Sequence, residues 1–295
     1  MNSVFDIINV PLGYLFKGIY ALVSNYGFTI VIFTLIVKFA MFPLTLKQQK
    51  SMKKTQALQP KMQALQEKYQ YDKEKLSQET MKLYQESGVN PMGGCLPLLI
   101  QFPILIALYN IIRKPLSYIM MMSSDRIMEI YEKLTGKAAE SFARIDQLGL
   151  AKMMEESAGT LGELANKVIN FDFFGLDLSV TPSFQFISQH PIYVLIPLLA
   201  GGTTFLVSHI SNKMAGTNTA NDQAASSMQT MNVIFPFMTA WFSITLPAGL
   251  GLYWTVSNLF QLAQTVLMNR FIKVDVPEFD SGVKHYRERK KKKKQ

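Results

Sequence analysis

One apolar stretch, residues 27–46, constrains the fold of this chain more than any other feature. Its twenty residues, at about 1.5 Å of helical rise each, match the ~30 Å hydrocarbon core of a bilayer. Lys38 lies in the second half of this stretch. An ionised side chain at such depth costs at least about 2.5 kcal/mol on insertion scales, so it normally faces a bundle interior or a water-filled cavity. The sequence therefore predicts a membrane span whose function depends on what Lys38 faces.

Similar apolar blocks recur along the chain, separated by strongly polar segments. Hydrophobic residues make up 48% of the 295 residues and charged residues 17%, and their separation into blocks is typical of a membrane protein. The further spans that we expect are residues 93–112, 191–210, 229–246 and 248–268. The predicted fold class is therefore all-α: a polytopic membrane protein with five transmembrane helices, the last two joined as a tight hairpin.

The distribution of Lys and Arg predicts the orientation of these spans, because cytoplasmic segments beside spans are enriched in both. Residues 47–92 contain nine lysines and five acidic residues, and residues 269–295 contain ten basic and four acidic residues. Residues 113–190 contain eight basic and ten acidic residues, and residues 1–26 contain one of each. We therefore expect an outer N-terminus and outer 113–190 loop, with residues 47–92, 211–228 and the tail in the cytoplasm.

The N-terminal segment, residues 1–26, is predicted to lie in the outer interface. Apolar residues of 11–26 recur at helical spacing around Lys17 and Ser24, which is typical of an interfacial amphipathic helix. A sixth, weak span is the alternative. No basic residue precedes Lys17, so we expect no cleavable signal peptide.

The segments on either side of the bilayer are predicted to be helical. Apolar residues from 58 to 69 lie on one helical face, and a second amphipathic helix ends at Gly88. Residues 47–92 should thus form a mobile cytoplasmic hairpin, which either recruits partners or only connects two spans. In the outer loop we expect helices at 126–134, 138–156 and 160–169, then an aromatic cluster at 171–176 that dips into the interface.

Polar side chains gather at one depth of the predicted bundle. Lys38 and Gln101 each lie eight residues from the cytoplasmic end of their span, about 12 Å inside at ~1.5 Å per residue. The other spans place polar residues at a similar depth: Thr203, Thr204, Thr239, Ser243, Trp254, Asn258 and Gln261. The outer halves of the spans are almost wholly apolar. This pattern predicts a hydrophilic groove in the inner leaflet, open to the cytoplasm, although Lys38 could snorkel instead and isolated polar residues also join helices.

The sequence contains no motif of an enzyme or a metal site. There is one cysteine, Cys95, and the three histidines are far apart in sequence. Glycine-rich phosphate loops, HExxH and GxSxG are absent. We expect no enzymatic activity, cofactor or metal.

A basic cluster closes the tail: Arg287, Arg289, Lys290, Lys291, Lys292, Lys293 and Lys294. It could fix the topology, bind anionic lipid at about 1 kcal/mol per residue, or bind RNA phosphates. The sequence does not choose among these.

Three ordered motifs in this layout resemble the YidC/Oxa/Alb family of membrane protein insertases, in its short Gram-positive bacterial form. The motifs are FPLTLKQQKSMKKTQALQPKMQALQEKY, NPMGGCLPLLIQFPILIALY and PAGLGLYWTVSNLFQLAQTVLMNR. The resemblance implies a multi-pass protein of the bacterial plasma membrane, N-out and C-in. Its charged groove would receive the polar outer tail of a small membrane protein, while the apolar helix of that substrate moves into lipid.

The resemblance also implies partners. These are nascent or newly made membrane proteins, the ribosome through the basic tail, the Sec translocon and anionic lipids. Most members have arginine where Lys38 stands; lysine keeps the charge but loses the bidentate fork. Many Gram-positive members also carry a lipoprotein signal, which we do not find. Two rivals are a small-molecule or ion-coupled transporter, which would often show an inverted repeat, and a structural scaffold with a dry groove.

Overall fold

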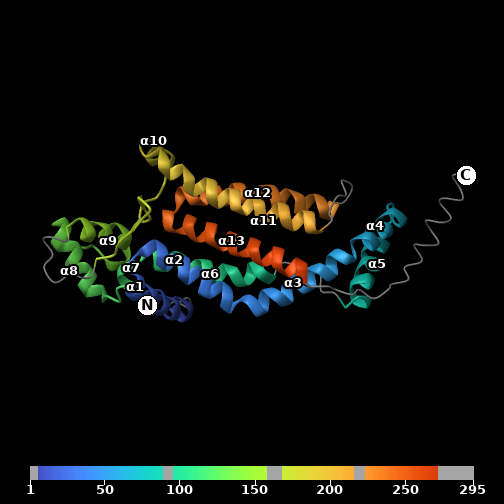
Figure 1. Ribbon diagram of the computed structural model, residues 1–295, viewed down its shortest axis with the longest axis horizontal. Coiled ribbons are helices and arrows are strands. Elements are labelled where there is room, and N and C mark those ends of the chain that lie inside the picture. The colour runs from blue at the N-terminus through green and yellow to red at the C-terminus, as the bar shows by residue number, and fades with distance from the viewer. Residues whose placement is uncertain (1–5, 89–95, 158–167, 216–222, 272–295) are drawn as a thin grey trace, which may run out of the picture.

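Helices form most of the described part of the protein, as Figure 1 shows. The computed structural model describes residues 6–88, 96–157, 168–215 and 223–271. The molecule is elongated, with α4 (Gln59–Lys68) and α5 (Lys73–Glu86) projecting at one end and α8 (Ser124–Thr135) and α9 (Gln147–Glu156) at the other. The prediction of a predominantly helical membrane fold is confirmed, with a two-stranded hairpin within residues 113–190, the predicted outer loop, as an addition.

The middle of the molecule is a bundle of long helices: α1 (Asp6–Val23), α2 (Tyr26–Ala40), α6 (Leu96–Arg113), α11 (Leu195–Ala215), α12 (Gln223–Thr245) and α13 (Ala248–Phe271). Helices α11, α12 and α13 pack on one another, α13 packs on α2, and α1 packs on α2 and α6. Residues 6–23 and 191–211 are long and apolar enough to cross a bilayer, and the bent pair 26–40 with 42–68 is a third candidate. Five spans remain a prediction.

The first predicted span is bent. Helix α2 ends at Ala40 and α3 (Phe42–Ala57) begins two residues later. The segments 26–40 and 42–68 differ in direction by 60°. Pro43 explains the break, because its ring has no N–H to donate and collides with the carbonyl of the preceding turn. Lys38 therefore lies in the last turn of α2, immediately before the bend.

Helix α1 begins at Asp6, earlier than the predicted interfacial helix at 11–26. Its Phe16 is fully buried and packs its ring against Tyr26 and Phe33 of α2. Ile7 and Leu22 on another face are largely exposed. One face of α1 thus belongs to the main hydrophobic core, while the other is free to meet lipid.

Residues 113–190, the predicted outer loop, add short helices around that core. They are α7 (Pro115–Tyr118), α8, η2 (Phe142–Arg144), α9, α10 (Phe184–Gln189) and η5 (Pro191–Val194). Buried Ile127, Ile130 and Leu148 join the core beneath them. The prediction of one helix over 138–156 is wrong, because only its second part is α-helical. The predicted helix at 160–169 lies mostly outside the described residues.

A small β-hairpin and the residues that flank it join the N-terminal ends of α2 and α13. Strand β1 (Asp172–Phe173) pairs antiparallel with β2 (Leu176–Asp177). The backbone N–H of Tyr26 donates to Asn170 O at 3.0 Å, and that of Ala248 donates to Val180 O at 2.8 Å. Since the first N–H groups of a helix have no partner within it, the hairpin satisfies the N-termini of both helices.

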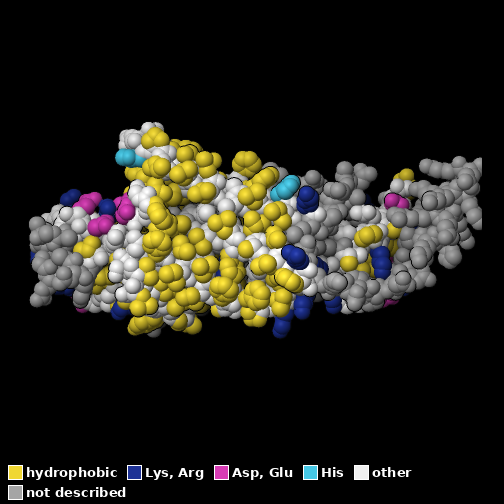
Figure 2. All heavy atoms as spheres, in the orientation of Figure 1, with side chains coloured by type: hydrophobic (Ala, Val, Ile, Leu, Met, Phe, Trp, Pro, Cys, Tyr) yellow, Lys and Arg dark blue, Asp and Glu magenta, His cyan; other side chains and the backbone are white. Residues whose placement is uncertain are grey.

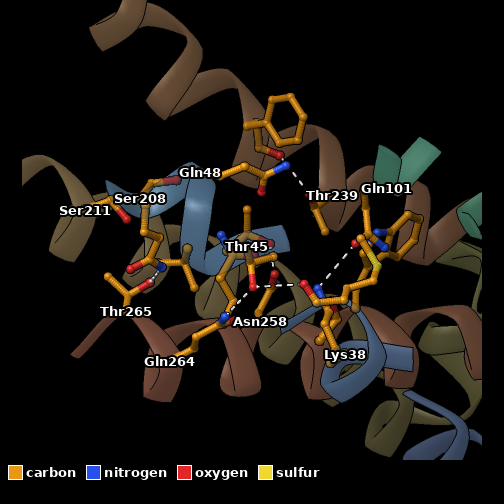
Figure 3. A pocket seen from close by; sticks show the side chains of 18 of the residues that line it. Lys38, Thr45, Gln48, Gln101, Ser208, Ser211, Thr239, Asn258, Gln264 and Thr265 are labelled. Atoms are coloured by element: carbon orange, nitrogen blue, oxygen red, sulfur yellow. Dashed lines mark hydrogen bonds between the residues drawn. The ribbon is translucent and has the colours of Figure 1, made fainter. Parts of the chain in front are cut away.

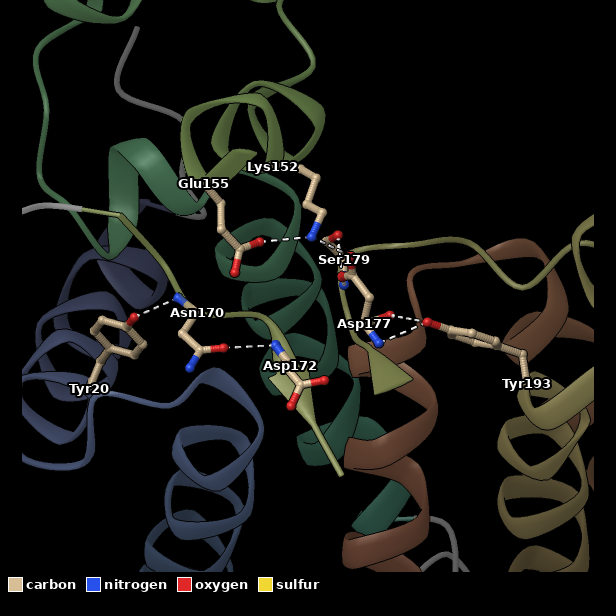
Figure 4. A network of polar contacts seen from close by, with 8 residues as sticks. All are labelled: Tyr20, Lys152, Glu155, Asn170, Asp172, Asp177, Ser179 and Tyr193. Atoms are coloured by element: carbon tan, nitrogen blue, oxygen red, sulfur yellow. Dashed lines mark hydrogen bonds and ion pairs between the residues drawn. The ribbon is translucent and has the colours of Figure 1, made fainter. Parts of the chain in front are cut away.

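An ionic network holds this hairpin against α9 (Figure 4). Lys152 Nζ lies 2.8 Å from Glu155 Oε2 and 2.8 Å from Asp177 Oδ2. Burial opposes the charge on Lys152, but its hydrogen bonds to the two carboxylates outweigh burial and raise its pKa. Burial likewise disfavours the charged Asp177, but Lys152 and Ser179 donate to it and hold its pKa below the usual value.

The hairpin of α4 and α5 has a core of its own. Leu58, Leu65 and Leu83 are buried there, and Met62 and Tyr84 pack against them. Tyr84 also donates to Met62 Sδ at 3.0 Å. Two amphipathic helices pair here as the sequence pattern indicates, and their buried residues are separate from the main core.

Candidate functional site

A cavity of about 420 Å³ lies within the bundle, beside α3. Side chains from α2, α3, α6, α11, α12 and α13 line it, as the close view in Figure 3 shows for its labelled residues. Amides and hydroxyls dominate the polar part of the lining, with Lys38 and Lys53 as its basic residues. No acidic side chain is among the described residues that line it. The cavity therefore combines apolar walls with neutral polar groups and positive charge.

Lys38 is held by a chain of side chains that crosses three helices. Its Nζ donates to Gln101 Oε1 of α6 at 3.3 Å. Gln101 in turn donates through Nε2 to the hydroxyl of Tyr253 on α13. Tyr253 is buried, with 2% of its surface exposed. Since Gln101 is neutral, the positive charge of Lys38 stays available to an anionic group that enters the cavity.

Asn258 joins α13 to α11 in the same cavity. Its Nδ2 donates to Thr204 Oγ1 at 2.8 Å and to Thr203 Oγ1 at 3.1 Å. Each threonine hydroxyl donates to a carbonyl of the preceding turn, Leu199 or Ala200. The carboxamide thereby fixes the separation of the two helices that form one wall.

Helix α3 forms another wall, and its side chains spaced four residues apart contact α13. Gln264 Nε2 donates to Thr45 Oγ1 at 2.5 Å, and Gln49 Nε2 donates to Thr265 Oγ1 at 3.3 Å. Lys53 Nζ lies 3.5 Å from Met268 O. Residues 45, 49 and 53 share one helical face, so α3 borders the cavity along two turns.

The structure gathers seven of the nine predicted groove residues around this cavity: Lys38, Gln101, Thr204, Thr239, Trp254, Asn258 and Gln261. Two predicted residues do not line it. Thr203 is 8% exposed and points at Asn258. Ser243 is fully buried and donates to Thr239 O. It packs against Gly251: a Cβ added to that glycine would lie 3.7 Å from the Cβ of Ser243, so Ser243 belongs to the close contact between α12 and α13. The predicted basic cluster of the tail lies outside the described residues.

Sequence reasoning missed the α3 wall. Gln48, Gln49 and Lys53 line the cavity, although the sequence analysis assigned them to a cytoplasmic hairpin at 47–92. Thr45, near the end of the predicted first span, lines it too. The signal was present in the polar residues that recur every four positions from Thr45, and in Gln264 and Thr265 near the end of the last span. These residues indicate a wall of the cavity only once the bend at Pro43 is known, because that bend brings α3 alongside the C-terminal part of α13.

Comparison with known proteins identifies the family of this chain. The family model described as 60Kd inner membrane protein matches residues 18–275. The chain belongs to the YidC/Oxa/Alb family of membrane protein insertases. It is 34% identical over 249 residues to the membrane protein insertase YidC 2 of Bacillus anthracis, covering 83% of this chain and 72% of that protein. Family membership and the apolar helices make this a membrane protein.

The chain spans only about a third to a half of the length of other relatives that it matches. The inner membrane ALBINO3-like protein 2, chloroplastic, of Chlamydomonas reinhardtii is 33% identical, over 86% of this chain and 52% of its own length. The membrane protein insertase YidC of Prosthecochloris aestuarii is 31% identical, over 92% of this chain and 36% of its own length. A crystal structure described as active YidC insertase with the first transmembrane domain resolved has a TM-score of 0.48 and 27% identity, and the match covers 90% of this chain and 47% of that one.

Proposed function

We propose that this protein inserts small membrane proteins and helps them fold. In this proposal the cavity receives the polar outer tail of a newly made membrane protein, and the apolar helix of that substrate then passes into lipid. The observation that carries the proposal is a cavity lined in part by amides and hydroxyls, with Lys38 in its wall and no carboxylate among its described lining residues. Membership of an insertase family supports the class of activity and gives the transporter alternative no support.

The cavity lowers the barrier that a polar tail meets. A peptide group or charged side chain in pure hydrocarbon loses its hydrogen bonds to water, at a cost of several kcal/mol per group. Amides and hydroxyls along α3, α11 and α13 replace part of that hydration. Lys38 attracts carboxylates of the tail, more strongly than in water because the surrounding bundle has a lower effective dielectric constant. No nucleotide is required, since burying an apolar helix in lipid is itself favourable.

Apolar side chains offer the substrate helix a path into lipid. Figure 2 shows hydrophobic side chains across the middle of the molecule, with basic side chains toward α3 and acidic and basic ones together toward α9. Helices α11 and α13 both line the cavity and expose large apolar residues such as Phe205, Leu206 and Leu259. We assign the lipid-facing surfaces of these two helices to the sliding substrate.

The same proposal assigns orientation and partners. The N-terminus and outer loop lie outside a bacterial plasma membrane, while the α4–α5 hairpin and basic tail lie in the cytoplasm. The hairpin contacts substrate, ribosome or Sec translocon. The tail contacts the ribosome, and anionic lipids balance the basic residues near α3. The charge asymmetry of the loops supports this orientation.

The proposed function is tested by protease protection. A single-span protein with an acidic outer tail is added to liposomes that contain the purified full-length protein, and to matched liposomes that contain an unrelated multi-spanning protein. We expect a protected fragment of the substrate only with the present protein. Equal protection in both preparations, with the protein shown to be folded, would contradict autonomous insertion.

A further inference from the structure

Gln48 is a buried side chain of the cavity whose polar atoms have no partner. It is 4% exposed and lines the cavity from α3. Neither Nε2 nor Oε1 has a hydrogen-bond partner within the described parts of the chain. By contrast, its neighbour Gln49 donates to Thr265 at 3.3 Å. Gln48 is thus a donor and an acceptor facing the cavity that the fold itself leaves unused (Figure 3).

An unsatisfied buried carboxamide is costly, so it calls for a partner that enters from outside the fold. Most buried polar side-chain atoms in proteins are hydrogen-bonded, and one that is not loses its hydration without compensation. A partner for Gln48 must supply an acceptor for Nε2 and a donor for Oε1. A lipid phosphate supplies acceptors alone, whereas a peptide group carries one donor and one acceptor.

The residues beside Gln48 fit a ligand of variable sequence. Met52 follows it by one helical turn, and Met41 lies at the bend; both line the cavity. Methionine side chains are flexible and adapt to differently shaped apolar groups. A carboxamide that pairs with the main chain, set among adaptable side chains, binds a polypeptide without selecting its sequence.

We propose that Gln48 hydrogen-bonds the main chain of a substrate tail in the cavity. This inference rests on the proposed function and deepens it by dividing the site into two parts. Lys38 reads acidic side chains and so depends on the sequence of the tail, whereas Gln48 reads peptide groups and accepts any sequence. Polar tails without acidic residues then still have a binding group in the cavity.

The test measures tail affinity directly. Fluorescent peptides with an acidic or a neutral tail are titrated against the full-length protein in nanodiscs, and binding is followed by anisotropy. We expect Gln48→Met to weaken both peptides by a similar factor, a few-fold to about tenfold, as for the loss of one hydrogen bond. Lys38→Met should weaken the acidic peptide alone. Gln185→Met, the same chemical change on exposed α10, is the control and should bind like the unaltered protein.

A backbone substitution separates main-chain contact from other causes. Tail peptides with single amide-to-ester replacements lose one N–H donor at a chosen position. At one or a few positions, the ester should weaken binding to the unaltered protein but not to Gln48→Met. If no position shows this difference, or if Gln48→Met binds both peptides normally, Gln48 contacts water only and the inference is overturned.

Folding and function are checked independently. Because methionine removes an unpaired buried amide, Gln48→Met should unfold at the same temperature as the unaltered protein or higher. A lower melting temperature would mean that Gln48 is structural and would count against the inference. The peptide titration needs no insertion step, so a failed protease-protection assay with normal, ester-sensitive binding would overturn the proposed insertase activity and leave the Gln48 contact standing.

Discussion

Two consecutive hydrogen bonds link α2, α6 and α13. Lys38 donates to Gln101, and Gln101 donates to Tyr253. Gln101 uses its carbonyl oxygen on the lysine and its amide on the tyrosine, so its orientation is determined by both neighbours. A glutamate at 101 would pair with Lys38 and cancel its charge. The neutral amide holds the cation in place and leaves its field in the cavity.

The charge of Lys38 should determine which substrates are handled well. Lys38→Arg keeps the charge and is expected to retain most insertion activity, whereas Lys38→Glu should reduce insertion of acidic-tailed substrates by about tenfold or more, since ~1.4 kcal/mol suffices for a tenfold change. Protease protection of paired substrates with acidic and neutral tails measures this. Equal loss for both tails would show that the substitution damages the fold rather than the electrostatics.

Asn258 should contribute to stability through its contacts with α11. Asn258→Leu removes the donor to Thr203 and Thr204 and is expected to cost about 1 kcal/mol, as for polar contacts between helices in membranes. Unfolding of the protein in detergent micelles measures the change. Thr245→Val is a suitable control, because the exposed Thr245 hydroxyl bonds only carbonyls of its own helix. A similar loss in both variants would contradict a role for the α11–α13 contact.

At the scale of elements, most of the cavity could be predicted from depth alone. Lys38, Gln101 and Asn258 lie at matching depths in apolar helices, and such helices must assemble with their polar groups inside. The α3 wall could not be predicted in this way, because its residues follow a proline and read as a soluble connector. The prediction that Ser243 lines the cavity failed for the opposite reason. Ser243 has the right depth, but the close approach of α12 and α13 at Gly251 encloses it.

The outer β-hairpin should make stability depend on pH. The pKa of Asp177 is lowered on folding, so its contribution is fully present above the unfolded value and is lost as pH falls toward the folded pKa. The pKa of Lys152 is raised, so its contribution is present below the unfolded value and lost as pH rises toward the folded one. Between about pH 4 and 10 the network is intact.

The Asp177→Asn substitution tests this dependence. The network is partly exposed, so its worth is modest, about 1 kcal/mol. We expect unfolding temperatures to fall between pH 5 and pH 3 in the unaltered protein, with a smaller fall in Asp177→Asn. An equal slope in both proteins would assign the acid sensitivity to other carboxylates.

At the scale of the whole molecule, positive charge is concentrated at the end that we orient toward the cytoplasm. Deleting residues 290–294 removes five lysines of the tail and should lower co-sedimentation with ribosomes at low salt, because phosphate contacts dominate such binding and weaken with salt. Post-translational insertion into liposomes should persist. Unchanged co-sedimentation at low salt would contradict a ribosomal role for the tail.

Because α4 and α5 have a core of their own, this hairpin can be replaced as a unit. Since Leu58, Leu65 and Leu83 share no buried neighbours with the main core, opening of the hairpin need not be transmitted to the bundle. Amide hydrogens of α4 and α5 can therefore exchange with solvent long before those of α2 or α13. For protein engineers, residues 58–86 form a cassette: another helical pair, or a docking module for a chosen partner, can take its place while the membrane-embedded chamber keeps its shape.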